Sequence, residues 1–103
     1  MKVIKILSDK IKEELHDAKS YAKMAIEYKE EYPELSRTLY NLSTQEMEHM
    51  NLLHNEVTAI IKKYRDTQGE PPPDMMAVYD YLHREQIDMA IEVKTLQNMY
   101  KDS

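Results

Sequence analysis

Glu46 and His49 lie three residues apart in a segment whose pattern predicts a long helix. Residues at this spacing share one side of a helix and lie about one turn apart. Leu39, Leu42 and Leu53 fall on the same side, so we expect that side to be buried. A buried carboxylate without a partner is costly, and a metal ion bound by the carboxylate and the imidazole is a strong candidate for that partner.

Composition and charge exclude several classes of function. The 103 residues include no Cys, which rules out disulfides, thiolate metal sites and cysteine nucleophiles. The net charge of −5 argues against general binding to nucleic acid, which needs a basic patch. No stretch approaches the roughly 20 apolar residues that span a membrane, and the N-terminal apolar run is too short for a signal peptide. We therefore expect a cytoplasmic protein with no nucleic-acid or membrane partner.

The chain is expected to form one domain of three long helices, because it holds a single Gly and is rich in helix-forming residues. Pro33 ends the first helix, since the residue before a proline is pushed out of the helical region. Gly69 is a natural C-terminal cap, and Asp74 is expected to cap the third helix. The expected helices cover about residues 2–31, 34–65 and 74–101, with a linker at 66–73.

Glu14 is the one carboxylate within the apolar heptad of the first expected helix. Two helices joined by a short turn run antiparallel, and at about 1.5 Å per residue Glu14 comes within roughly 3 to 8 Å of the level of Glu46 and His49. Two oxygen donors and one nitrogen donor suit iron, manganese or zinc better than calcium or magnesium. The sequence therefore predicts a metal layer formed by Glu14, Glu46 and His49.

These two segments resemble the ferritin-like superfamily of di-iron carboxylate bundles. The resemblance rests on Glu14 followed by Tyr21, and on the run Gln45-Glu46-Met47-Glu48-His49, and it covers about residues 7–60. The most similar members are short encapsulated ferritins and rubrerythrin-like proteins. The resemblance implies an all-α antiparallel bundle in which Glu14, Glu46 and His49 are metal ligands. It also implies that Tyr21 is a catalytic tyrosine whose hydroxyl points at the metal.

The chain departs from that family in holding only half of the ligand set. A complete di-iron bundle takes one Glu from each of two helices and Glu-x-x-His from each of the other two. Two chains related by a two-fold axis would supply that set, so a homodimer or higher homo-oligomer is expected. Glu85 is the remaining candidate metal ligand, which either completes the site within one chain or lies at the dimer surface, and Asp88 and His83 are weaker candidates.

Three functions remain open from the sequence. The first is iron binding with ferroxidase activity or another oxidoreductase reaction of dioxygen or peroxide. The second is a structural zinc or manganese site, and the third is a metal-free helical interaction or assembly module that keeps the fold. The motif alone is weak, because Glu13 and His16 have the same spacing off the apolar seam. We interpret that pair as solvated, and we expect His16 and His54 at the surface.

Overall fold

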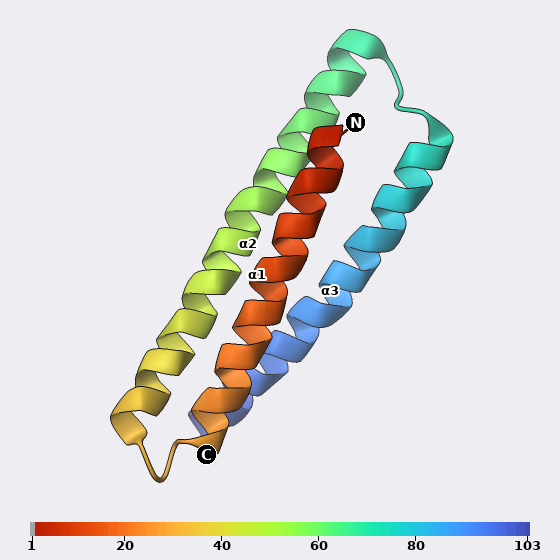
Figure 1. The fold of residues 1–103 in the computed structure, drawn as a ribbon. Coiled ribbons are helices and arrows are strands. Elements are labelled where there is room, and N and C mark those ends of the chain that lie inside the picture. The colour runs from red at the N-terminus through yellow and green to blue at the C-terminus, as the bar shows by residue number, and fades with distance from the viewer. Residues whose placement is uncertain (1) are drawn as a thin grey trace.

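The computed structural model describes residues 2–103 and consists of three long helices (Figure 1). These are α1 (Lys2–Glu27), α2 (Pro33–Gln68) and α3 (Pro73–Asp102). The prediction of an all-α fold with three long helices is therefore confirmed. Among residues 2–103, no helix is both long enough and apolar enough to cross a membrane.

The first two helices end where the local chemistry favours a break, although both predicted ends are wrong, since α2 continues three residues past its predicted end into the predicted linker. α1 stops at Glu27, four residues before the predicted end, because the chain turns before Pro33 and the Tyr32 N–H donates to the Tyr28 carbonyl at 2.8 Å. α2 runs to Gln68 and is capped by Gly69, whose φ of 84° suits a residue without a Cβ.

The third helix begins one residue earlier than predicted. Pro72 is its N-cap and Pro73 its first residue, so the prediction of Asp74 as N-cap is wrong. A proline lacks the N–H that would be left unbonded at this position, and its fixed φ already suits a helix. Asp74 lies in the first turn instead, where its charge interacts favourably with the positive end of the helix.

α1 and α2 pack closely because small residues line their contact. Ala18, Ala22 and Ala25 of α1 are fully buried, as are Ser36 and Ser43 of α2. The Ser43 hydroxyl donates to the Ala18 carbonyl at 2.7 Å, and the Ser36 hydroxyl donates to the Ala25 carbonyl. Each serine hydroxyl forms a hydrogen bond with the backbone of the neighbouring helix, so burying the two hydroxyls lowers stability little. The small side chains allow the helices to approach closely.

These two hydrogen bonds fix the register of the antiparallel pair. Ser36 and Ser43 are seven residues apart on α2, and their acceptors Ala25 and Ala18 are seven residues apart on α1. Four residues before Ala18 on α1, and four residues after Ser43 on α2, the chain reaches Glu14 and Met47. The register therefore brings Glu14 level with the stretch between Glu46 and His49.

α3 lies along α1, and its C-terminal half is the part most firmly attached (Figure 1). There the Gln97 amide donates to the Ser43 hydroxyl at 2.9 Å, and the rings of Tyr40 and Tyr100 stack with centroids 4.5 Å apart. Lys29 adds a hydrogen bond from its ammonium group to the Tyr100 carbonyl. Toward its N-terminus α3 diverges from α2, as Figure 1 shows.

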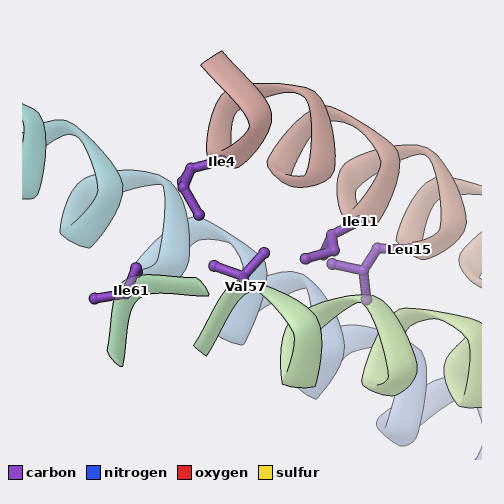
Figure 2. Close-up of a cluster of buried hydrophobic side chains, with 5 residues drawn as sticks. All are labelled: Ile4, Ile11, Leu15, Val57 and Ile61. Carbon is purple, nitrogen blue, oxygen red and sulfur yellow. The ribbon is translucent and has the colours of Figure 1, made fainter. Parts of the chain in front are cut away.

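An aliphatic cluster holds the other end of the α1–α2 pair. Figure 2 shows Ile11 and Leu15 of α1 turned toward Val57 of α2, in a cluster completed by Ile4 and Ile61. The described residues extend over 55 × 19 × 18 Å, and their radius of gyration is 16.5 Å. A compact domain of 100 residues has a radius of gyration of about 13 Å. The chain is therefore an elongated layer of helices with much side-chain surface left on its outer faces.

Ala22→Leu tests the close approach of α1 and α2. Ala22 is fully buried, so three added carbons must displace a neighbouring helix, and we expect the free energy of unfolding to fall by about 1–3 kcal/mol. Ala59→Leu is the matched control, because Ala59 is exposed on α2. Urea unfolding followed by circular dichroism measures both. Equal stability of the two variants would contradict the packing described above.

Candidate metal centre

Glu14 of α1 lies next to Glu46 and His49 of α2, as the register requires. His49 Nδ1 is 3.6 Å from Glu14 Oε2 and 3.8 Å from Glu46 Oε2. One donor atom from each of the three residues lies within 4.8 Å of the other two. Two carboxylates and one imidazole from two helices thus converge, with donor separations close to those across a single metal coordination sphere.

In the part of the chain that the structure describes, no lysine or arginine forms an ion pair with these carboxylates. Within residues 2–103, the ion pairs of Glu14 and Glu46 are with His49 alone, and that imidazole is charged only when protonated. Lys10, one turn before Glu14 on α1, pairs instead with Glu13 at 3.3 Å. With a neutral imidazole the group carries two negative charges in a small volume, which attracts a cation.

The group is less buried than the sequence predicts. The side chains of Glu14 and Glu46 are 24% and 18% exposed, but that of His49 is 55% exposed. The expectation that this side of α2 is fully buried is therefore wrong for His49. The reason is that α3 covers the opposite side of the α1–α2 pair.

The contacts of α3 with α1 identify that opposite side. The Gln86 amide donates to the Ser8 carbonyl at 3.3 Å, and Lys19 forms an ion pair with Glu92 at 2.7 Å. At about 100° per residue, Ser8 and Lys19 lie about 120° and 140° around α1 from Glu14. The carboxylate of Glu14 is therefore directed away from α3.

We call the uncovered side of the α1–α2 pair the open face. Besides the three polar residues it carries apolar side chains at heptad spacing. Leu35 is 46% exposed, whereas Leu42 and Leu53 are half-buried. A donor group on this face is accessible to a metal ion and also to a second protein surface.

Glu85 does not join the group. It is exposed on α3 and lies, with Asp9 and Lys12, beside a small cavity between α1 and α3. The expectation that Glu85 completes the site within one chain is therefore not met, because α3 packs on the far side of α1. A hydrogen bond with Glu85 instead raises the pKa of the Tyr81 hydroxyl above its ordinary value.

The other two candidates on α3 also lie away from the group. Asp88 is exposed, and His83 packs against His54 on the side of α2 that α3 approaches. His54 is half-buried and stacked, so the expectation that it lies free at the surface is wrong. The sequence around His54 does not indicate that its ring is stacked, because the stacking partner His83 is brought there by the path of α3 after the linker.

Tyr21 lies on the same side of α1 as Glu14. The two residues are seven positions apart, which is about 10 Å along the helix axis. The Tyr21 side chain is half-buried, and within residues 2–103 its hydroxyl makes no hydrogen bond to Glu14, Glu46 or His49. Tyr21 therefore lies two helical turns from Glu14 on the same side of α1.

The second Glu-x-x-His pair differs from the first in its surroundings. Glu13 and His16 are both exposed on α1, and neither belongs to the group of converging donors. The interpretation of this pair as solvated is confirmed.

Comparisons of the chain with protein-family models, with curated proteins and with solved structures each find no match.

Glu85→Ala is expected to lower the pKa of Tyr81 toward its ordinary value. The substitution removes the carboxylate that accepts the Tyr81 proton in a hydrogen bond and that opposes formation of the phenolate. The ¹³C signal of the phenolic carbon, followed as pH rises, measures the change. Asp88→Ala, which alters an exposed carboxylate two turns from Tyr81, is the control. An unchanged Tyr81 pKa in the Glu85→Ala chain would contradict the position assigned to Glu85.

Proposed function

We propose that the chain binds a transition metal, most naturally Fe(II), through Glu14, Glu46 and His49. The observation that carries this proposal is the pair of carboxylates that no lysine or arginine neutralises within residues 2–103, together with an imidazole nitrogen within 4 Å of both. Two oxygen donors and one nitrogen donor fit iron, manganese or zinc. The exposure of His49 leaves room for further ligands around a bound ion.

We further propose that two chains complete one dinuclear centre across a two-fold axis. One chain supplies two carboxylates and one imidazole, which is half of a di-iron ligand set of the ferritin-like type. Glu85 of α3 does not supply the missing half, and the three donors lie on the open face. A second copy that packs its own open face there would cover Leu35 and bring a second donor group close to the first.

Iron bound at such a centre supplies electron transfer to dioxygen or peroxide, so the proposed activity is that of a ferroxidase-type oxidoreductase. The chain's own contribution is to place donors. The carboxylates of Glu14 and Glu46 balance the charge of the metal, and His49 adds a neutral nitrogen donor. Tyr21 is about 10 Å from Glu14 along α1, so the role proposed for it is to orient a metal ligand or to donate an electron, and not to bind the metal itself.

Glu46→Gln/His49→Gln is expected to abolish iron binding while the chain stays folded. The change removes two of three donors from a partly exposed site, so the aliphatic cluster is untouched. The matched control is Glu13→Gln/His16→Gln, which has the same spacing and the same chemistry off the open face. Elemental analysis after anaerobic Fe(II) loading and desalting gives the iron content per chain.

Equal iron content in the two double variants would overturn the assignment of Glu46 and His49. No iron in the unsubstituted chain would favour the metal-free interaction module, in which the polar residues only fix the register of a dimer. That alternative predicts that apolar replacements of Glu14, Glu46 and His49 leave dimerisation intact or strengthen it.

Leu35→Glu is expected to convert the dimer into a monomer. Leu35 is 46% exposed in the single chain, so the substitution costs the folded monomer little, but it would bury a charge between two open faces. Ile91→Glu is the control, because Ile91 is 61% exposed and belongs to α3, which covers the side of the α1–α2 pair opposite the open face. Analytical ultracentrifugation separates the outcomes. A dimer that survives Leu35→Glu would contradict the proposed interface.

A further inference from the structure

The rings of two histidines, one from α2 and one from the N-terminal half of α3, meet between these helices. The imidazole rings of His54 and His83 stack with centroids 4.9 Å apart and planes inclined by 16°. The ring of Tyr79, one turn before His83, lies on the His83 ring with centroids 5.7 Å apart and planes inclined by 11°. The stack lies on the side of α2 that faces α3, away from the open face.

His83 has a nitrogen without a partner. Its Nδ1 is buried, and within residues 2–103 no hydrogen bond satisfies it. A buried polar atom without a hydrogen bond lowers the stability of the fold by about 1–3 kcal/mol. Native structures therefore keep such an atom mainly where a ligand, ion or water binds to it. The lone pair of a neutral imidazole nitrogen is also a common protein ligand for transition metals.

A cavity of about 170 Å³ adjoins the two imidazoles. The cavity is lined by Met50, Asn51, His54, His83, Gln86, Ile87 and Ala90, none of which is a lysine or an arginine. The amide nitrogen of Gln86 donates to Ser8, which leaves the oxygen of the same side chain as an available acceptor or ligand. Burial, and to a lesser degree His83, lowers the pKa of His54, so its ring stays neutral to a lower pH than usual.

We propose that His54 and His83 form a second metal site, which binds a divalent ion of the zinc, nickel or copper class and links α2 to α3. A Zn–N bond of about 2.0–2.1 Å places two ligating nitrogens no more than about 4.2 Å apart. The stacked rings present their faces to one another, and an imidazole binds a metal in its own plane, so both rings must turn out of the stack to direct their nitrogens at one ion. The ion would bind the otherwise unbonded Nδ1 of His83. It would also link the N-terminal half of α3, which diverges from α2, to α2.

The test isolates this site from the proposed iron site. Zn²⁺ is titrated by calorimetry into the Glu46→Gln/His49→Gln chain, which lacks two donors of the open face. We expect one Zn²⁺ per chain, with affinity at least tenfold lower after a further His83→Gln or His54→Gln. Loss of even an outer partner of a metal ligand costs 10–100-fold, which sets this lower bound. A further His16→Gln, which changes an exposed histidine, should leave the affinity unchanged.

A second measurement avoids substitutions in the stack. In the same Glu46→Gln/His49→Gln chain, the imidazole NMR signals of His54 and His83 should shift together on addition of Zn²⁺, while those of His16 stay in place. Absence of Zn²⁺ binding, or binding that His83→Gln leaves unchanged and that moves neither stacked ring, would overturn the proposal. The pair would then be a packing contact only. Because this background lacks Glu46 and His49, neither result depends on the proposed function.

Discussion

The register between α1 and α2 is the constraint on which the rest of the molecule depends. Two buried serine hydroxyls on α2 donate to two backbone carbonyls on α1, seven residues apart in each helix. Because both bonds must be made at once, the helices cannot slide by a turn without leaving two buried hydroxyls unsatisfied. The alanines between them allow the close approach that makes these bonds possible. Glu14 meets Glu46 and His49 as a consequence of this register.

The position of α3 decides which surface of the α1–α2 pair is available for function. α3 attaches to the side of Ser8 and Lys19 on α1, through Gln86 and Glu92. The opposite side keeps three converging donors and several apolar residues without cover from the same chain. Metal binding and self-association are therefore linked proposals, since one uncovered surface carries the features that support both.

The sequence predicts the parts of the structure that depend on local pattern. Heptad spacing identifies three helices, Gly69 marks the end of the second, and one turn at Pro33 is enough to bring Glu14 to the level of Glu46. The position of Glu85 could not be predicted in this way. The linker after Gly69 contains three prolines. No periodic pattern in the sequence indicates against which side of the α1–α2 pair the helix after this linker packs.

The contact between His54 and His83 could not be predicted from the sequence for the same reason. His54 and His83 are far apart in the chain, and their stacking follows only from the path of α3 beside α2. The partial exposure of His49 has the same origin, since the heptad pattern shows that a side is apolar but not whether the same chain covers it. A helix side that packs against a second chain and a helix side buried within one chain show the same periodicity of apolar residues.

Native mass spectrometry of the chain after anaerobic Fe(II) loading tests the central claim most directly. The account predicts a species of two chains that carries two iron ions at the open face, one for each group of Glu14, Glu46 and His49. A single chain that holds two iron ions would contradict it, because the site would then be complete without a partner. A dimer that takes up no iron would contradict it equally, and would leave these residues as a polar layer between two chains.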